Sequence, residues 1–304
     1  AMNSIKLGEY PMVLAGGVEM PSASPFFITE DQLIDWRDKK VKDIQELVIR
    51  ADVRDALWCS MHDVHTIVHA ENTTASWVEK KGLNREEFKK AIDEYAVLSA
   101  ERALRALKMG YFSHEIAPVE ETEKNDEIPR IKKMSRLSRL RGTHFTPDGL
   151  FLTSHNSPPL ANGAAYLLLM SRETAYGKKL KPLARITGYS RAGIRPEKFL
   201  LAPIKAVKKL LEKTETKISD YDLLEMNTSY GSQILINKDE LNLDMNKVNI
   251  YGDCIALGHP VGAAGARILT TLIYALKNER KKRGLAAICL GGGNALAISV
   301  EREE

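Results

Sequence analysis

The sequence predicts an α/β fold. In the second half of the chain, apolar runs of strand length alternate with segments of helical periodicity, which is the pattern of packed helix and sheet layers. Glycine and proline mark the boundaries between these segments. Of the 304 residues, 44% are hydrophobic and 28% are charged. This ordinary globular usage excludes disordered and collagen-like chains.

The N-terminal third predicts short elements followed by one long helix. Residues 12–15 fit a buried strand, and Gly16 and Gly17 fit a tight turn. A helix should begin after Asn84, whose side chain can cap its first turn, and should end at Gly110.

The C-terminal half predicts a regular alternation of strands and helices. An apolar run at residues 164–171 fits either a strand or a buried helix. Strands are further expected at residues 182–189, 222–226, 286–290 and 295–300, and helices at residues 203–211 and 260–283. Gly284 should close the last helix, and the three glycines at residues 291–293 should form a turn.

Charge and cysteine content narrow the classes of function. Lys and Arg number 44 and Asp and Glu number 40, which leaves a net charge of +4. This excess is too small to indicate nucleic-acid binding and mildly favours an anionic ligand. The three cysteines do not form a disulfide framework, and no apolar run reaches the ~18 residues of a membrane span. We therefore expect a cytoplasmic protein.

Cys289 is the first candidate for chemistry. It ends a predicted strand directly before three glycines. Glycines there let the backbone approach a ligand closely, and their N–H groups can bind an oxyanion. The alternative is a buried structural cysteine, which is common in proteins.

His259 and Asn227 occupy comparable positions. His259 precedes a helix start built from small residues, where the helix N-terminus lowers an imidazole pKa and offers N–H donors to an anion. Asn227 follows a predicted strand, where it can cap the next helix or hold a water or an oxyanion. Cys, His and Asn also describe a thiol protease. That interpretation is the weaker one, because no helix follows Cys289 to lower its pKa.

Four potential metal ligands lie close together in the sequence. They are Cys59, His62, His65 and His69, and on a helix His65 and His69 would share a face. This spacing could hold zinc. Because no carboxylate or second cysteine completes the ligand set, we expect histidines that line a pocket and no metal site.

A basic run covers residues 130–141, with six Lys and Arg and no acidic residue. Such a run is usually a solvated face. It can also hold a phosphorylated ligand.

Together, the three polar segments resemble the thiolase family. Its Asn-Glu-Ala-Phe, Gly-His-Pro-x-Gly and Cys-x-Gly-Gly-Gly motifs correspond, in order, to residues 227–230, 258–262 and 289–293. Weaker similarities extend over essentially the whole chain, at residues 15–20, 65–72, 82–87 and 156–165.

The resemblance implies a layered αβαβα fold and an enzyme that acts on acyl-coenzyme A thioesters. Such an enzyme condenses two acyl-CoA molecules or cleaves a 3-ketoacyl-CoA with free CoA, so coenzyme A enters as substrate and no cofactor is held. The implied domains are an N-terminal domain remnant at residues 1–24, a loop domain at 25–158, a return segment at 159–181 and a C-terminal domain at 182–304.

The resemblance also implies roles for individual residues. Cys289 would move the substrate α-proton, and His259 would activate the nucleophile and help bind the thioester oxygen. Asn227 would hold the water of that oxyanion hole, and the N–H of Gly291 would belong to a second one. Contacts with coenzyme A are implied for His65, Arg136, Arg139, Ser154, Asn156, Ser157, Ser229 and Tyr230.

The sequence departs from the family at the nucleophile. Thiolases carry the acyl group on a second cysteine, just upstream of the helix that precedes Ala-Gly-Gly. No residue here corresponds to it, because Cys59 and Cys254 lie in other segments. We therefore expect a split enzyme, a hetero-oligomer in which a second polypeptide supplies this cysteine and the rest of the N-terminal domain. The alternative is a truncated or decayed thiolase that cannot acylate itself. Thr228 in place of the motif's Glu is a smaller departure.

A function of a different class stays open. The chain can be a non-catalytic protein that binds CoA thioesters or acts as a scaffold. The missing nucleophile and the altered motif at Asn227 favour this alternative. The presence of both His259 and Cys289 favours the enzyme, because a binding module has no need of the pair.

Overall fold

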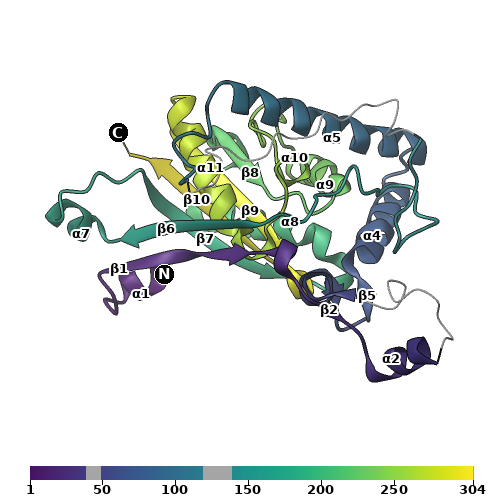
Figure 1. The fold of residues 1–304 in the computed structure, drawn as a ribbon. Helices are drawn as coiled ribbons and strands as arrows, with labels where there is room; N and C mark the ends of the chain where they lie inside the picture. Colours follow the sequence, from purple (N-terminus) through teal and green to yellow (C-terminus); the bar gives the residue numbers. More distant parts are fainter. Residues whose placement is uncertain (39–48, 119–138, 304) are drawn as a thin grey trace.

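The computed structural model of the chain describes residues 1–38, 49–118 and 139–303. At its centre is a four-stranded sheet with the order β7 (Ala184–Gly193), β10 (Asn294–Arg302), β9 (Arg283–Leu290) and β8 (Leu223–Met226) (Figure 1). β8 runs parallel to β9, and the other neighbours are antiparallel. The α/β class is confirmed.

Two helices enclose this sheet. α8 (Ala202–Thr214) packs on one face and α11 (Ala264–Asn278) packs on the other. Each helix turns an apolar stripe toward the sheet; Leu210 of α8 and Leu272 of α11 are fully buried. α11 also packs against β1 and β6, so it lies between two sheets.

The second sheet has two strands. β1 (Met12–Glu19) and β6 (Gly163–Met170) pair antiparallel along their whole lengths (Figure 1). α8, the large sheet, α11 and this small sheet therefore form four successive layers, which match the first four layers of the expected αβαβα arrangement. The apolar run at residues 164–171 forms a strand and not a helix, because its backbone hydrogen bonds are made with β1.

The remaining elements precede and connect these layers. Before β6 they are α1 (Met2–Lys6), η1 (Pro21–Ala23), β2 (Phe26–Phe27), α2 (Glu30–Arg37), β3 (Ile49–Arg50), α3 (Ala51–Ala56), β4 (Trp58–Cys59), β5 (Val64–His65), α4 (Thr66–Lys80) and α5 (Arg85–Lys108). After β6 they are α7 (Arg172–Gly177), η3 (Pro196–Leu201), η4 (Ile218–Asp220), α9 (Gly231–Leu241), α10 (Cys254–Leu257), η5 (Val261–Ala263) and η6 (Gly291–Gly293).

The long helix α5 begins where the sequence predicts. The side chain of Asn84 accepts a hydrogen bond from the N–H of Glu87 at 3.1 Å, which caps the first turn. Beyond its last turn, Gly110 takes the left-handed conformation that ends a helix without strain. Among the described residues, no helix combines the length and the apolar composition needed to cross a membrane.

The predicted turn at Gly16 and Gly17 is wrong. β1 continues straight through both residues. A side chain on Gly16 would collide with the backbone of Ala165 in β6, and one on Gly17 would collide with the carbonyl of Gly262. These glycines serve close packing of backbones, not a change of direction.

The predicted helix at residues 260–283 is too long at both ends. η5 precedes α11, and α11 ends at Asn278, after which Arg280 adopts a positive φ of 52°. Gly284 does not close the helix; it lies in β9, where a Cβ would come within 2.9 Å of the Leu272 side chain.

Candidate functional site

The site is built at one edge of the large sheet. Because β8 and β9 are parallel, their carboxyl ends meet at the same edge. Asn227 directly follows β8, and Cys289 is the next-to-last residue of β9. The N–H of Asn227 donates to the carbonyl of Ala287 at 2.9 Å, which fixes the chain leaving β8 against β9.

A hydroxyl links Asn227 to Cys289. The Sγ of Cys289 lies 3.0 Å from the Oγ of Ser229, and the Nδ2 of Asn227 donates to the same Oγ at 3.3 Å. Asn227 does not cap the following helix, because the N-cap of α9 is Tyr230 and has no side-chain capping bond. The capping alternative is therefore wrong.

Gln233 fixes the backbone of Ser229, and the sequence gives no signal for this role of Gln233. Its Oε1 accepts the N–H of Ser229 at 2.9 Å, and its Nε2 donates to the carbonyl of Leu200 at 3.3 Å. Gln233 is fully buried in the first turn of α9. Only the tertiary contact with the Cys289 strand shows that this turn belongs to the site.

The surroundings of Cys289 determine its protonation state. The residue is partly exposed, but protein encloses its Sγ closely enough for burial to raise the pKa of the thiol. Hydrogen bonds from Ser229 and Gln233 act in the opposite direction and lower this pKa. Burial dominates, so the thiol form prevails at neutral pH.

His259 lies in a backbone bend beside the loop at residues 159–161. Its N–H donates to the carbonyl of Pro159 at 2.8 Å. Gly258 has a φ of +88°, and a side chain there would meet Ala161 at 2.6 Å. Burial, with a smaller contribution from Arg267, lowers the pKa of His259 to about 4. The imidazole is therefore neutral at pH 7, and burial is the main cause.

The N-terminal strand anchors the loop that carries His259. The carboxylate of Glu19, at the end of β1, accepts the N–H of Gly262 at 3.1 Å. Gly17 lets β1 approach the carbonyl of Gly262 closely. The Ala-Gly-Gly and Gly-His-Pro segments, which lie more than 200 residues apart, thus form one packing unit.

Two of the motif side chains carry a buried polar atom that has no partner among the described residues. These atoms are the Oδ1 of Asn227 and the Nδ1 of His259. Buried polar atoms are nearly always paired, so the amide oxygen of Asn227 is suited to accept a hydrogen bond from a water, and the imidazole nitrogen of His259 is suited to exchange one with a substrate or a water. The Oγ of Ser157 is a third atom of this kind.

The glycine turn next to Cys289 leaves room for a ligand. Gly292 and Gly293 have positive φ values of 71° and 81°, which glycine adopts without strain. No atom lies within 4 Å of the place where a Cβ of Gly291 would be. The backbone of Gly291 therefore borders open space beside the Cys289 strand.

Tyr230 and His65 connect the site to the start of α4. The hydroxyl of Tyr230 lies 2.9 Å from the Oγ1 of Thr66. His65 is the N-cap of α4; its Nδ1 accepts the N–H of Ile67 at 3.1 Å, and its ring stacks on Phe145 at 4.2 Å between centroids. Burial lowers the pKa of His65 to about 4.

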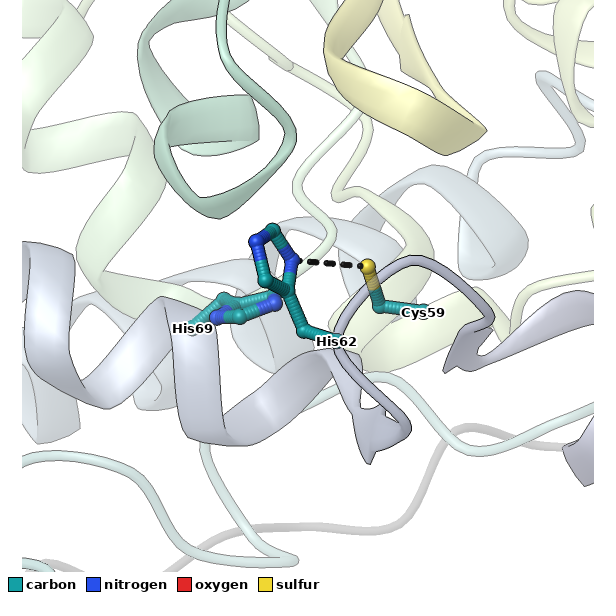
Figure 2. A group of neighbouring side chains, drawn as sticks. All are labelled: Cys59, His62 and His69. Atoms are coloured by element: carbon teal, nitrogen blue, oxygen red, sulfur yellow. Dashed lines mark hydrogen bonds between the residues drawn. The ribbon is translucent and has the colours of Figure 1, made fainter.

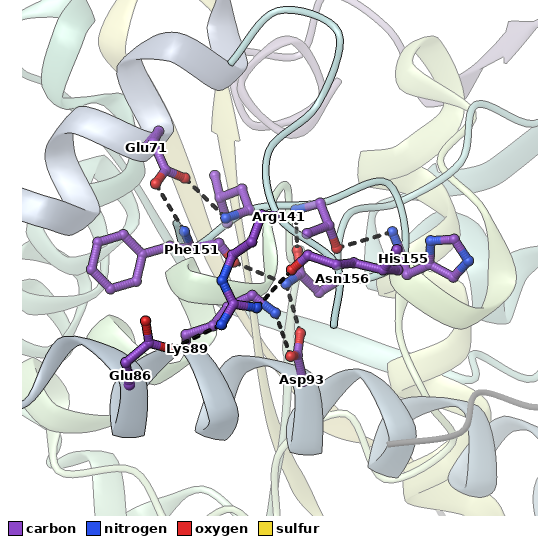
Figure 3. Close-up of polar contacts among 11 residues, drawn as sticks. Glu71, Glu86, Lys89, Asp93, Arg141, Phe151, His155 and Asn156 are labelled. Atoms are coloured by element: carbon purple, nitrogen blue, oxygen red, sulfur yellow. Dashed lines mark hydrogen bonds and ion pairs between the residues drawn. The ribbon is translucent and has the colours of Figure 1, made fainter. Parts of the chain in front are cut away.

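The loop at residues 150–157 is held by buried polar groups (Figure 3). The carboxylate of Glu71 accepts the N–H groups of three consecutive residues, at distances between 2.7 and 2.9 Å. These three residues are Leu150, Phe151 and Leu152. Lys89 and Asp93 form a buried ion pair on α5 below this loop.

Asn156 is a supporting residue of this loop. Its Oδ1 accepts the N–H of Thr153 at 2.9 Å, and its Nδ2 donates to the carboxylate of Asp93 at 2.9 Å. Its carbonyl accepts the N–H of Gly231 and so seats the start of α9. Because its amide is fully engaged, Asn156 positions the site and has no free group for coenzyme A. Ser154 is exposed and contacts His155.

The basic run is described only at its end. Arg136 lies outside the described residues. Arg139 is exposed, and Arg141 forms an ion pair with Glu86 at 3.0 Å.

Comparisons with known proteins agree with this arrangement. The model of the thiolase N-terminal domain matches residues 1–173, and that of the thiolase C-terminal domain matches residues 180–302. A probable acetyl-CoA acyltransferase of Staphylococcus aureus is 36% identical over 311 residues, which cover 99% of this chain and 75% of that protein.

Solved structures give the same result. The Bacillus anthracis acetyl-CoA acetyltransferase superposes with a TM-score of 0.83 at 37% identity. An Ascaris suum thiolase in complex with coenzyme A superposes with a TM-score of 0.84 at 32% identity. Each comparison covers 99% of this chain and 74% of the other. With both domain models matched and the Asn227 and Cys289 motifs joined at one sheet edge, the chain belongs to the thiolase family.

Proposed function

We propose that the chain transfers acyl groups between coenzyme A thioesters, either by condensing two acetyl-CoA molecules or by cleaving a 3-ketoacyl-CoA with CoA. The observation that carries this proposal is the contact of Cys289 with Ser229 and Asn227 at the sheet edge. The names of the relatives support it, since they are acetyl-CoA acyltransferases and acetyltransferases. The Ascaris relative binds coenzyme A itself.

Cys289 is the proposed acid and base. When the nucleophilic cysteine is acylated, the Cys289 thiol gives its proton to the departing CoA thiolate and becomes a thiolate. In condensation, this thiolate takes a proton from the α-carbon of acetyl-CoA, and this carbon attacks the acyl carbon held on the nucleophilic cysteine. The carbon–carbon bond forms as the carbon–sulfur bond breaks, and the nucleophile leaves as a thiolate. In cleavage, the Cys289 thiol returns the proton to the α-carbon. The raised pKa of this thiol suits the proton-donating step.

His259, Asn227 and Gly291 are the proposed stabilisers of negative charge. The neutral imidazole of His259 can take the proton of the nucleophilic thiol and bind the thioester oxygen. Asn227 holds a water beside this oxygen, and the N–H of Gly291 binds the carbonyl of the acyl-enzyme. The unpartnered buried atoms of His259 and Asn227 support this assignment.

We assign the acyl-bearing nucleophile to a second polypeptide, so that the active species is a hetero-oligomer. The cysteines of this chain are unsuited to the role. Cys254 is fully buried, donates its S–H to the carbonyl of Thr228 and has its pKa raised by burial. The Sγ of Cys59 lies in the β4–β5 hairpin, 3.4 Å from the Nδ1 of His62, and Cys59 does not stand in the segment where the family carries its nucleophile.

An exposed apolar face supports the second polypeptide. The outward face of the β1–β6 sheet carries Leu14, Val18, Tyr166 and Leu168, each between 54% and 64% exposed. Strands that are apolar on both faces are normally covered on both faces. A two-stranded sheet is also only marginally stable by itself. We infer that the partner covers this face.

We also propose the contacts with coenzyme A and the division into domains that the family resemblance implies. His65, Ser154, Ser157 and Tyr230 would line the approach of the thioester, and Arg136 and Arg139 would meet its phosphates. The proposed segments are an N-terminal domain remnant at residues 1–24, a loop domain at 25–158, a return segment at 159–181 and a C-terminal domain at 182–304. A reducing cytoplasmic location accords with three free cysteines.

The test is the intact mass of all polypeptides that co-purify with the chain from its native cell, together with their acyl-transfer activity. We expect a second, cysteine-containing polypeptide in equal amount, and loss of condensation when Cys289→Ala replaces the chain in the complex. A single longer species would refute the separate polypeptide. Folded chain without a partner or activity would favour the non-catalytic binding protein.

A further inference from the structure

Three potential metal ligands meet at the hairpin that joins β4 to β5. Cys59 ends β4, His62 lies in the turn, and His69 lies one turn into α4. Their ligand atoms all lie within 4.8 Å of one another (Figure 2). We call these three residues the hairpin cluster.

The distances in the hairpin cluster suit one small ion. The Sγ of Cys59 lies 3.4 Å from the Nδ1 of His62. Zinc binds cysteine sulfur at about 2.3 Å and histidine nitrogen at about 2.0–2.1 Å, so two such ligands in tetrahedral geometry lie about 3.5 Å apart. The Sγ of Cys59 and the Nδ1 of His62 are therefore already as far apart as two ligands of one zinc ion. The rings of His62 and His69 meet edge to face, with centroids 4.9 Å apart.

His69 supplies an independent observation that points to a ligand. It is only 8% exposed, and its Nε2 is buried with no hydrogen-bond partner in the described part of the chain. An unpaired buried nitrogen is costly, and native structures keep few of them. A metal ion would satisfy this nitrogen.

The other candidates near the hairpin are already engaged. The Nδ1 of His65 caps α4, and its ring stacks on Phe145. The carboxylate of Asp63 accepts from Arg54 and from the indole N–H of Trp58. Of the four potential ligands in the sequence, His65 is thus excluded, which leaves the three residues of the hairpin cluster.

We propose that Cys59, His62 and His69 bind a zinc ion. One thiolate and two imidazoles form a donor set of intermediate softness, which suits zinc better than magnesium or calcium. Water completes the fourth position. The nearby carboxylate of Glu197 interacts electrostatically with both imidazoles and favours a cation there.

The ion would fix the hairpin beside the reaction site. The Cε of Met61, within the hairpin turn, lies 3.7 Å from the place where a Cβ of Gly292 would be. Thr66, which follows the hairpin, contacts the hydroxyl of Tyr230. Zinc between β4 and α4 therefore sets the position of a turn that touches the Gly291–Gly293 segment.

The test is zinc and cobalt binding by the tag-free chain, in its complex or alone. We expect about one equivalent of Zn²⁺ by elemental analysis, and a cobalt-loaded form with tetrahedral visible bands and a thiolate-to-cobalt charge-transfer band. Cys59→Ser and His69→Gln should weaken Zn²⁺ binding about 100-fold or more in a competition titration with a chromophoric chelator. His144→Gln, which removes a neighbouring exposed imidazole, is the matched control and should bind as the wild type does.

Two results would overturn the proposal. One is wild-type chain that takes up no Zn²⁺ at micromolar concentration or a cobalt spectrum without the thiolate band, neither of which depends on whether a variant folds. The other is equal binding by Cys59→Ser and the wild type. Hydrogen exchange tests the positioning role: on addition of Zn²⁺ the amides of residues 59–65 should become protected, and unchanged exchange would contradict it.

Discussion

At the scale of single residues, both proposed proton carriers are neutral at pH 7. Burial raises the pKa of the Cys289 thiol and lowers the pKa of the His259 imidazole. The two groups therefore do not form the thiolate–imidazolium pair of a thiol protease. The neutral thiol is the form that returns a proton to the α-carbon, whereas taking that proton requires the thiolate, which the raised pKa makes the minor form at pH 7.

The Ser229 hydroxyl should tune the thiol. Ser229→Ala removes a hydrogen bond that lowers the pKa of Cys289, so the pH profile of condensation should shift to higher pH. The rate at pH 7 should fall about tenfold, the effect of one hydrogen bond of about 1.4 kcal/mol. Steady-state condensation across pH measures both effects. Ser113→Ala, which removes an exposed hydroxyl after α5, is the control, and an unshifted profile for Ser229→Ala would contradict the assignment.

His259 and His65 should make the folded chain sensitive to acid. Both have a pKa of about 4 when folded and about 6.5 when unfolded. As the pH falls, the unfolded chain binds these protons first. The stability due to each residue is thus fully present above about pH 6.5 and is lost progressively down to about pH 4. The loss amounts to about 3 kcal/mol for each residue.

Urea unfolding between about pH 7 and pH 4.5 measures this dependence. His259→Gln should remove its share of the slope, and exposed His114→Gln should leave the slope unchanged. Glu225 acts in the opposite direction: burial raises its pKa to about 8, so its contribution is lost as the pH rises from about 4.3 through about 8. The difference between wild type and His259→Gln isolates the histidine. An unchanged slope in that variant would show that His259 is not buried in its neutral form.

At the scale of elements, close backbone packing joins distant motifs. Gly17 brings β1 against the carbonyl of Gly262, and Glu19 holds the N–H of the same residue. The loop carrying His259 therefore depends on β1 for its position.

Gly17→Ala should separate β1 from η5. The added methyl group collides with backbone, which cannot move aside as a side chain can, so we expect a loss of about 1–3 kcal/mol in the free energy of unfolding and a loss of activity. Gly177→Ala at the end of α7 meets no atom within 4 Å and is the matched control. Thermal unfolding of both variants measures the difference in stability. Equal melting temperatures would contradict close packing of β1 at Gly17.

Local sequence signals predict most helices and strands, but they do not predict the residues at which contacts with distant segments end an element. The cap at Asn84 and the apolar stripe of α8 mark helices correctly, because each is a property of neighbouring residues. Basic residues after Asn278 are typical of a helix end, yet pairing of β9 with β10 takes over at Arg283. The glycine pair at residues 16–17 has no local signature that separates a turn from a close contact.

The candidate site likewise contains residues that the sequence predicts and residues that only the fold shows. Motif order indicates Asn227, His259 and Cys289 without any coordinates. Gln233 and the supporting role of Asn156 depend on contacts between segments far apart in the sequence, so only the fold shows them. For the same reason, the sequence could not separate His65, which caps a helix, from His62 and His69, which face Cys59.

At the scale of the whole molecule, the outward face of the β1–β6 sheet is the proposed contact with the partner. Leu14→Glu places a charge on this face, where Leu14 is 64% exposed, so the chain itself should remain folded. Association should be lost, because burying an unpaired carboxylate is unfavourable. Co-purification and sedimentation measure it. Leu33→Glu, on exposed α2, is the control and should associate normally; partner binding by both variants would place the interface elsewhere.

In the proposed enzyme, Cys289 moves the proton while another polypeptide carries the acyl group. The most direct test is to incubate the complex with labelled acetyl-CoA and map the labelled cysteine, with wild-type chain and with Cys289→Ala. We expect label on a cysteine outside the 304 residues in both cases, and condensation in the wild type only. Label on Cys59, Cys254 or Cys289, or undiminished condensation by Cys289→Ala, would contradict this division of roles.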